Sequence, residues 1–431
     1  METKRIGFVS TRFAGTDGVS LEAKKWAEVL GRLGHESYWF GGVLDTPEET
    51  SLTVPEAFFN DPDNLALNTE IYGTQVRSRD TTNRIYRAKE YLKDRLYDFL
   101  ERFALDVLVS QNALSIPMHI PLGLALSEVI AETGLPTIAH HHDMWWERSR
   151  FLLNAVQDIL QSAFPPDLPS MRHVVINSMI QRELAARRGL TSTLIYNVID
   201  FDADRAGVDE FNSDFRETFG FSDDDILILQ PTRVVSRKGI EQAIYLVKQL
   251  DMPRVKLLIS HSAGDEGTGY QDWLVDTASQ QGIPIYFLAN RLHDTRRYDE
   301  AGTKLYSLWD VYPHVDLVTY PSLYEGFGNA FLEAVYFRKP LLVNRYSVYV
   351  VDIEPKGFDT VAIDGFLSRD AVSEVKQLLL DPNRRAEMTD HNYELARRFF
   401  SFDMLEQRVS GVLQSFFGAS PEVARGSQLL P

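Results

Sequence analysis

The stretch LYEGFGNAFLEAVYFRKP, residues 323–340, joins two glutamates and two glycines to the apolar pattern of a helix. Glycine destabilises helices and is kept where the backbone turns sharply or approaches a ligand, so Gly326 and Gly328 indicate a binding loop. Glu325 lies in this loop, and Glu333 is expected two turns into the helix, so both carboxylates can face one site at different depths. Because the neighbours of Glu333 are mostly apolar, its helix should be mainly buried and the carboxylate needs a partner.

A second informative loop is PTRVVSRKG, residues 231–239, which follows a β-branched run and precedes a helical pattern. It places Arg233, Arg237 and Lys238 at the start of a helix. Guanidinium and ammonium groups in that position suit a diphosphate. When the loop is considered alone, a solvated basic turn explains it equally well. The formal charge of the whole chain is −17, however, so this local concentration of positive charge favours an anion site.

Short β-branched runs alternate with amphipathic stretches through both halves of the chain. The expected strands lie at 6–9, 38–40, 106–109, 137–139, 174–176 and 194–196, and then at 226–229, 255–259, 285–288, 315–319 and 341–343. Strands separated by helices form parallel sheets of βαβ units. The fold class is therefore expected to be α/β, with two doubly wound Rossmann-like domains facing a central cleft where ligands bind.

Three segments depart from this alternation. Residues 44–80 are acidic, rich in Pro and Asn and poor in periodicity, so we interpret them as an insertion over the edge of the first sheet. Residues 84–104 form a strongly amphipathic helix, whose charges are more typical of a solvated face than of a membrane anchor. Residues 201–225 contain nine acidic residues and no long apolar run, which is the composition of an interdomain linker with a polar surface helix.

Composition excludes several classes of function. A chain of 431 residues favours two domains, and the absence of cysteine excludes disulfides, thiolate catalysis and Cys-based zinc sites. The acidic balance argues against a nucleic-acid binder. No segment approaches the roughly 20 apolar residues of a membrane span, and the N-terminus does not resemble a signal peptide. We therefore expect a cytoplasmic protein with no membrane association.

A glycine-bearing loop, STRFAGTDGVS, follows the first expected strand at residues 10–20. Gly15 and Gly18 open a helix there, so the backbone can present N–H groups to an anion or a sugar. The loop is not GxGxxG, and no carboxylate follows the second strand to hold a ribose, so a dinucleotide site is not expected. A plain tight turn is the alternative.

The run HHHDMWWE begins at His140, where another strand of the first half ends. Three histidines suggest a metal, but consecutive residues on a strand point to alternating faces, so this run alone should not bind zinc. The remaining possibilities are a histidine at the ligand site and a histidine buried in the core.

Taken together, Arg233 followed by Lys238, and then the E-x7-E spacing from Glu325 to Glu333, resemble the retaining GT-B glycosyltransferases of family 4. The resemblance covers nearly the whole chain. Even YNVID, residues 196–200, is similar to the PNGVD stretch of that family, with valine in place of glycine. No single motif is specific, but the combination is.

The resemblance implies roles for individual residues. Arg233 and Lys238 would bind the donor diphosphate, Glu333 the nucleotide ribose and Glu325 the sugar hydroxyls. His142, with His141 as the alternative, would lie beside the reacting sugar. The other implied donor-binding residues are Gly15, Gly18, Gly326, Phe327, Gly328 and Asn329. No metal or other cofactor would be required.

The implied activity is transfer of a hexose, with retention, from a nucleotide diphosphate sugar of the UDP-glucose or GDP-mannose type to a hydroxyl. The leaving phosphate would deprotonate the acceptor. We expect a small soluble acceptor, as in synthesis of sucrose-like disaccharides or glycosyl glycerates, over a lipid. The alternatives are a GT-B sugar-nucleotide epimerase, a sugar phosphorylase and a non-catalytic two-domain sugar-binding protein.

The expected domains are an acceptor-binding domain at 1–204 and a nucleotide-sugar-binding domain at 205–399. As in the family that the chain resembles, a C-terminal helix at 400–417 would cross back onto domain one. The alternative is that this helix caps domain two. A disordered tail is expected at 418–431.

Overall fold

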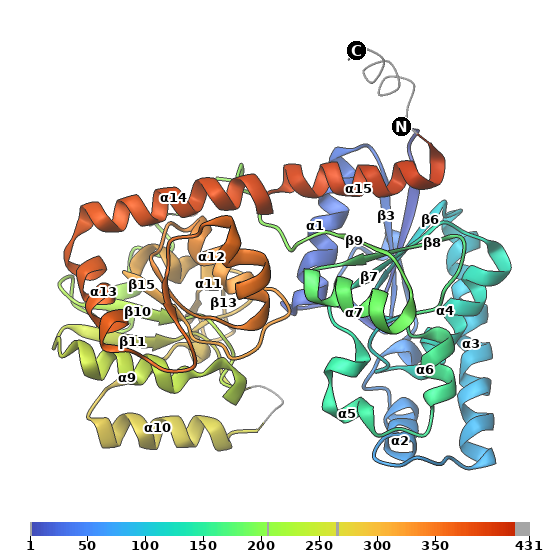
Figure 1. Ribbon diagram of the computed structural model, residues 1–431, viewed down its shortest axis with the longest axis horizontal. Helices are drawn as coiled ribbons and strands as arrows, with labels where there is room; N and C mark the ends of the chain where they lie inside the picture. The colour runs from blue at the N-terminus through green and yellow to red at the C-terminus, as the bar shows by residue number, and fades with distance from the viewer. Residues whose placement is uncertain (1, 205–206, 264–266, 419–431) are drawn as a thin grey trace. The chain divides into compact units, whose positions relative to one another are not determined.

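The computed structural model describes residues 2–204, 207–263 and 267–418. The chain divides into two compact units (Figure 1). One unit contains Met1–Asn197 and the chain from Phe402 on, and the other is Val198–Ser401. We call them unit 1 and unit 2. Among the described residues, none of the helices combines the length and the hydropathy that crossing a bilayer requires.

Unit 1 is built on a parallel sheet whose strands lie in the order β5-β3-β1-β6-β7-β8-β9. These strands are β1 (Arg5–Val9), β3 (Glu36–Gly41), β5 (Ser51–Thr53), β6 (Val107–Gln111), β7 (Thr137–His141), β8 (Met171–Val175) and β9 (Ser192–Leu194). A short parallel pair, β2 (Arg12–Phe13) with β4 (Val43–Leu44), follows the ends of β1 and β3. The expected βαβ alternation of this half is confirmed.

Helices cover the sheet of unit 1 and bury apolar faces against it. They are α1 (Gly18–Arg32), α2 (Pro62–Ile71), α3 (Arg79–Phe103), α4 (Ile120–Thr133), α5 (Ser149–Leu152), α6 (Gln157–Ala163), α7 (Ser178–Arg188) and α15 (Phe402–Phe417). The spacing of Trp26, Val29 and Leu30 on α1 is helical, and all three are buried. Asp17 caps this helix by accepting bonds from the N–H groups of Val19 and Ser20.

The interpretation of residues 44–80 as an insertion over the sheet is corrected by the structure. This segment supplies β5, which extends the sheet by pairing with β3, and helix α2, which buries Leu67 and Ile71. The strand has only three residues, so it shows no readable alternation. Two turns of 3₁₀ helix flank it, at Glu48–Thr50 and Pro55–Ala57.

Unit 2 contains a second parallel sheet, with the strand order β12-β11-β10-β15-β16-β17. Its strands are β10 (Ile226–Gln230), β11 (Val255–Ile259), β12 (Ile285–Phe287), β15 (Leu317–Tyr320), β16 (Leu341–Asn344) and β17 (Val361–Ile363). The expected strands of this half are confirmed. The edge strand β17 and the small hairpin of β13 (Arg297–Tyr298) and β14 (Lys304–Leu305) were not predicted.

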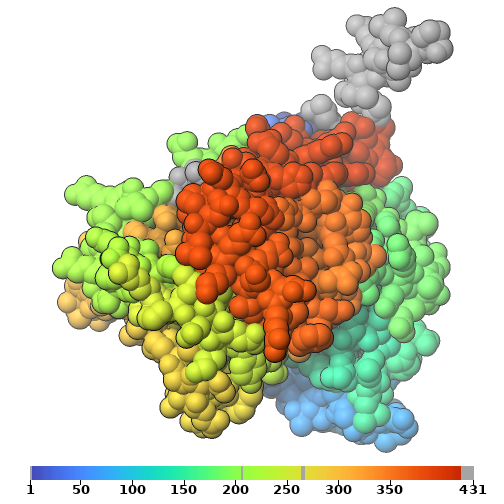
Figure 2. Space-filling view, turned by 60° about the vertical axis from the view of Figure 1, so that its left-hand side comes forward, coloured from blue at the N-terminus to red at the C-terminus, as the bar shows by residue number. Residues whose placement is uncertain are grey.

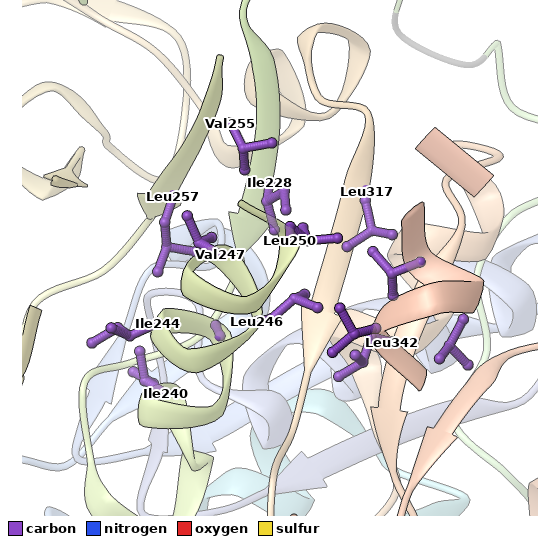
Figure 3. Packing of buried hydrophobic residues seen from close by; sticks show 14 of the residues in the cluster. Ile228, Ile240, Ile244, Leu246, Val247, Leu250, Val255, Leu257, Leu317 and Leu342 are labelled. Atoms are coloured by element: carbon purple, nitrogen blue, oxygen red, sulfur yellow. The ribbon is translucent and has the colours of Figure 1, made fainter. Parts of the chain in front are cut away.

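The helices of unit 2 pack on this sheet in the same manner. They are α8 (Phe215–Thr218), α9 (Ile240–Leu250), α10 (Gly269–Gln281), α11 (Leu308–Val311), α12 (Asn329–Tyr336), α13 (Arg369–Leu380) and α14 (Pro382–Phe400). Figure 3 shows Ile240, Ile244 and Val247 of α9 packed with Ile228 and Leu257 of the sheet. Helices α13 and α14 form part of the surface that faces the viewer in Figure 2.

The segment predicted as a linker, residues 201–225, is anchored in unit 2 at several described positions. Phe201, Phe215 and Phe221 are buried in unit 2, and the ring of Phe215 stacks on that of His314 at 4.9 Å between centroids. The boundary between the units therefore falls at residues 197–198, ahead of the predicted 204–205. Acidic residues dominate the composition of the segment, so the composition alone does not indicate that the phenylalanines between them are buried.

The chain passes between the units a second time at residues 401–402. Helix α15 lies alongside α1 (Figure 1), where the ring of Phe402 packs under the guanidinium of Arg32 at 4.8 Å. Next to the two crossings, the Ile199 N–H donates to the Phe400 carbonyl at 2.9 Å. The tail expected at 418–431 lies outside the described residues from residue 419 on.

Candidate functional site

The two informative loops of unit 2 meet because their strands are neighbours. From β10 the chain proceeds outward to β11 and β12, and it then returns to place β15 on the other side of β10. Ligands of open parallel sheets bind at such a switch point, beyond the carboxyl ends of the strands. Residues 231–239 follow β10 and residues 321–328 follow β15, so both loops lie at this position.

Lys238 and Glu325 form an ion pair at the switch point. Both side chains are nearly buried, with exposed fractions of 10% and 11%. A second cation lies close by, since Arg237 Nη1 is 3.6 Å from Glu325 Oε2. The Lys238 ammonium also lies 5.7 Å from the centre of the Tyr320 ring. The sequence analysis assigned Lys238 and Glu325 to one site, and the structure brings them into direct contact.

The environment of Lys238 opposes its charge. Burial lowers the pKa of the Lys238 ammonium, the carboxylate of Glu325 raises it, and the charges of Arg237 and Arg233 lower it further. Arg233 itself is exposed. Lys238 and Arg237 therefore share one nearly buried carboxylate, and the charge of Arg233 acts on the same ammonium, which is an arrangement that suits a ligand with more than one negative charge.

His261 was missed by sequence reasoning. It follows β11, next to the switch point, and its Nδ1 lies 2.6 Å from Ser260 Oγ. Burial lowers the pKa of His261, and the charges of Arg233 and Lys238 act in the same direction. The ring therefore belongs to the electrostatic surroundings of this cationic cluster. A lone histidine after a strand carries no spacing signal that could have identified it.

Two glycines of these loops are required by close packing. Gly239 has φ of +59°, and a Cβ there would lie 2.5 Å from the Pro321 carbonyl oxygen, so it lets the two loops approach each other. Gly328 has φ of +134°, and a Cβ would lie 2.5 Å from Tyr346 Oη. That hydroxyl donates to the Phe327 carbonyl at 2.7 Å. Packing against Tyr346 accounts for Gly328 before any ligand is considered.

Glu333 lies in the second turn of α12, because the helix begins only at Asn329. The residues on both sides of it are buried, as expected, while Glu333 is partly exposed. Its Oε2 accepts a hydrogen bond from Tyr312 Oη at 3.0 Å. Tyr312 is fully buried, and this burial raises the pKa of its hydroxyl well above the usual value. The phenol therefore stays protonated and is a permanent donor to the carboxylate.

Unit 1 has its own switch point, beyond the carboxyl ends of β1 and β6. The chain leaves β1 for β3 and β5 on one side and returns to β6 on the other. Ser10 Oγ, after β1, donates to the Gln111 carbonyl at the end of β6 at 2.9 Å. The glycine-bearing loop and the histidine run were predicted separately, and this topology brings both to one end of one sheet.

The structure changes the interpretation of the glycine-bearing loop. The Gly15 N–H already donates to Asp45 Oδ2 at 3.0 Å. At the start of α1, which begins at Gly18, the Asp17 carboxylate accepts from the first free N–H groups. Asp17 therefore occupies the position that the sequence analysis gave to a bound anion. Its second oxygen, Oδ2, accepts from Arg12 Nη2 at 3.0 Å.

The surroundings of His141 differ from those of His140 and His142, as strand alternation requires. His141 Nε2 lies 3.0 Å from His173 Nδ1 on the neighbouring strand. The ring of His140 packs against Trp26 at 4.5 Å and against His142 at 4.4 Å. No group of three or more His, Cys, Asp or Glu side chains that could hold a metal ion occurs in the described part of the chain.

His142 is held by the end of β6. Its N–H donates to Asn112 Oδ1 at 2.8 Å, and its Nε2 pairs with Gln111 Oε1 at 2.9 Å. In this pairing Nε2 carries the proton, which leaves Nδ1 as an acceptor. Burial lowers the pKa of His142 to about 4, against the opposing charges of Asp143 and Asp17. The ring is thus a neutral imidazole of fixed orientation. Nothing in the sequence indicated Gln111.

Comparison with known proteins extends this picture. The family model of glycosyl transferases group 1 matches residues 302–395, which include both glutamates. The chain is 32% identical to mannosylglucosylglycerate synthase of Thermotoga maritima, over 94% of this chain and 99% of the relative. It is 31% identical to mannosylglucosylglycerate synthase of Petrotoga mobilis, over 92% of this chain and 98% of the relative.

Solved structures share the fold at low identity. A glycosyltransferase of Rickettsia africae matches with a TM-score of 0.69 at 12% identity, covering 97% of this chain and all of the other. Anabaena HepE in complex with UDP-glucose matches with a TM-score of 0.65 at 13% identity, over 96% of this chain and 100% of HepE. Together with the two parallel sheets and the end-to-end relatives, these matches establish that the chain belongs to glycosyl transferases group 1 and is a glycosyltransferase of the GT-B fold.

Proposed function

We propose that this glycosyltransferase transfers a mannosyl group from a nucleoside diphosphate mannose to glucosylglycerate, with retention at the anomeric carbon. The single observation that carries the proposal is the match to two relatives of one name, each along nearly its whole length. Both are mannosylglucosylglycerate synthases, so the product contains mannose, glucose and glycerate. This is a glycosyl glycerate, one of the small soluble product types that the sequence analysis considered.

The cationic cluster of unit 2 is proposed as the donor diphosphate site. Lys238, Arg237 and Arg233 bring positive charge to one end of the sheet, and Lys238 is nearly buried there. Charge stabilisation is stronger where water is excluded, and preformed donors need no reorganisation during the reaction. Glu333, oriented by Tyr312, would accept the hydroxyl protons of the nucleotide ribose.

Glu325 has two tasks in this proposal. Before the donor binds, it neutralises Lys238, and this keeps a buried ammonium charged. Once the diphosphate supplies negative charge to Lys238, the carboxylate can accept hydrogen bonds from sugar hydroxyls. The remaining donor contacts, from residues 326–329 and from Gly15 and Gly18, stay proposals. Because the Gly15 N–H already donates to Asp45, it is the least available of these proposed donors.

Unit 1 is proposed to bind the acceptor, with His142 beside the reacting sugar. A neutral imidazole can hydrogen-bond a hydroxyl without adding charge next to an anomeric carbon that becomes positive. In the transfer, the bond from the anomeric carbon to the diphosphate oxygen breaks, and a bond to the acceptor oxygen forms on the same face. The acceptor proton moves to the leaving phosphate oxygen. The chain contributes positioning and charge stabilisation.

The test is an assay of the purified chain with GDP-mannose, UDP-mannose, GDP-glucose and UDP-glucose, each with and without glucosylglycerate. Release of nucleoside diphosphate reports turnover, and NMR of the product reports the anomeric configuration. We expect product only with a mannose donor and the acceptor together, and an α-mannoside from the α-linked donor. A β-mannoside would refute retention.

Other outcomes distinguish the alternatives. Release of nucleoside diphosphate without an acceptor would indicate hydrolysis, and conversion of the donor to another sugar nucleotide without that release would indicate epimerisation. Turnover that requires inorganic phosphate would indicate a phosphorylase. Transfer of glucose in place of mannose would overturn the donor assignment. Lys238→Ala should lose activity, while Lys248→Ala is the matched control. Lys248 is a lysine at the far end of α9, where it bonds to the Gln281 carbonyl.

A further inference from the structure

Arg12 lies at the switch point of unit 1, three residues beyond the end of β1. It belongs to β2, which pairs with β4 and so fixes the backbone of the loop. Its guanidinium packs over the ring of Phe59 at 5.4 Å, and its Nη2 donates to Asp17 Oδ2 at 3.0 Å. The side chain has an exposed fraction of 35%. It is therefore an oriented cation that a ligand can reach.

The partners of Arg12 leave part of its hydrogen-bonding fork available. Within the described residues, its one hydrogen bond uses Nη2, so no described group accepts from Nε or Nη1. Arg148, which follows the histidine run, differs in this respect, because its Nε and Nη2 both donate to Asp143. A planar fork with unused donors is the side chain best suited to bind a carboxylate.

Neighbours of Arg12 also interact with His142 or with the residue that holds it. Asp17, its ion-pair partner, is near enough to raise the pKa of His142. Ser10, on the same loop, is hydrogen-bonded to Gln111, and Gln111 holds the His142 ring. The ends of β1, β6 and β7 therefore place the loop of Arg12 and the neutral imidazole at the same end of the sheet.

A second observation indicates that a ligand completes this site. Gln111 is fully buried, and its Nε2 donor has no partner among the described residues. A buried donor without an acceptor is costly, and the cost is removed when an oxygen-rich molecule or a bound water reaches it. This unsatisfied donor belongs to the same side chain that orients His142. Polar groups from outside the chain are therefore expected at this end of the sheet.

We infer that Arg12 binds the carboxylate of the acceptor, so that it selects a glycosyl glycerate over the corresponding neutral glycosyl glycerol. The inference rests on the proposed transfer to glucosylglycerate, and it assigns a specificity residue that this proposal leaves open. The guanidinium would hold the glycerate end while the glucosyl end points toward His142. Asp17 would then act as a positioning residue that holds Arg12 in place.

The experiment compares two acceptors that differ only in the carboxylate, glucosylglycerate and glucosylglycerol. Values of kcat/KM are measured for the full chain and for Arg12→Gln, Arg12→Lys and Lys24→Gln. Lys24 is a half-buried lysine on α1 that pairs with Asp45, and it serves as the charge-matched control. Loss of a charge-assisted bond to a carboxylate should lower kcat/KM for glucosylglycerate by about 10- to 100-fold in Arg12→Gln, mainly through KM.

The two acceptors separate a binding role from a structural one. Activity of Arg12→Gln with glucosylglycerol should stay within about threefold of wild type, because that acceptor has no carboxylate to lose. An equal fall with both acceptors would mean that Arg12 only maintains the fold, and no fall with either would place the carboxylate elsewhere. Arg12→Lys keeps the positive charge but lacks the planar guanidinium, so its loss of kcat/KM for glucosylglycerate should be intermediate. This variant also tests the inference if Arg12→Gln does not fold.

The same experiment also tests the proposed function, by a different outcome. Wild-type protein that binds its donor but transfers to neither acceptor would refute transfer to glucosylglycerate, and the inference on Arg12 with it. Wild-type protein that transfers equally well to both acceptors would refute Arg12 selectivity alone.

Discussion

Replacing Glu325 by glutamine should destabilise unit 2 before any substrate is added. The substitution keeps the shape of the side chain but leaves the Lys238 ammonium nearly buried, without its carboxylate and still repelled by the charges of Arg237 and Arg233. Breaking a buried pair from one side costs about 3–5 kcal/mol in general. A lysine can limit this cost by losing its proton, so we expect a loss of about 3 kcal/mol in the free energy of unfolding at pH 7.

The opposite substitution should cost less. In Lys238→Met, Glu325 retains Arg237 at 3.6 Å as a counter-ion, so we expect a loss of about 1–2 kcal/mol. The double variant removes both charges, and methionine fills the space of the lysine stem, so its stability should be close to that of wild type. The cycle then yields a coupling of about 4–5 kcal/mol between the two residues, the sum of the two single losses.

The measurement should report on unit 2 alone, because a chain with two compact units does not have to unfold in a single step. Native-state hydrogen exchange of the amides in α9 and α12 does so. If the opening free energy of these amides in Glu325→Gln lies within about 0.5 kcal/mol of the wild-type value, the reasoning is refuted. It is also refuted if the double variant loses as much stability as the two single variants together.

Three further outcomes follow from the site and from the buried histidines. Lys238→Ala and Arg233→Ala should each lower kcat about 100-fold, and near-normal steady-state kinetics in both would contradict the diphosphate assignment. Glu333→Gln should weaken binding of the nucleoside diphosphate about 10-fold by titration calorimetry, while Glu325→Gln weakens it little; equal losses would contradict these roles. Burial lowers the pKa of His119 to about 4, so the folded state resists a proton that the unfolded chain binds below about pH 6.5. The free energy of unfolding should fall by up to about 3 kcal/mol as the pH drops from about 6.5 to about 4. Melting curves of His119→Asn over the same pH range should show a smaller fall.

Much of the fold was predictable because periodicity is local. The strands that carry the two sheets are continuous apolar runs, and α1 and α9 show clear helical spacing. The alternation rule also predicted that His141 faces away from its neighbours His140 and His142. The structure agrees, since the rings of His140 and His142 pack together and His141 pairs with His173.

The parts that were not predictable depend on contacts far apart in the sequence. Tyr312, the partner of Glu333, lies 21 residues upstream on another element. Gln111 orients His142 across two strands, and a single glutamine carries no spacing signal. Gly328 was attributed to a ligand, although Tyr346 already requires it. In each case the pattern identified the residue or its loop, and only the fold identified its neighbour.

The packing of α15 on α1 has a consequence for the synthesis of the chain. Unit 1 begins at the N-terminus, yet one of its helices is encoded after the whole of unit 2. At about 5–20 residues per second, the surface of α1 that receives α15 waits roughly 10–40 s while about 200 residues of unit 2 are made. Unit 2 emerges as an uninterrupted segment and can complete its core first. The second unit can therefore fold while the first is still open, and α15, which leaves the exit tunnel after unit 2, closes the first unit.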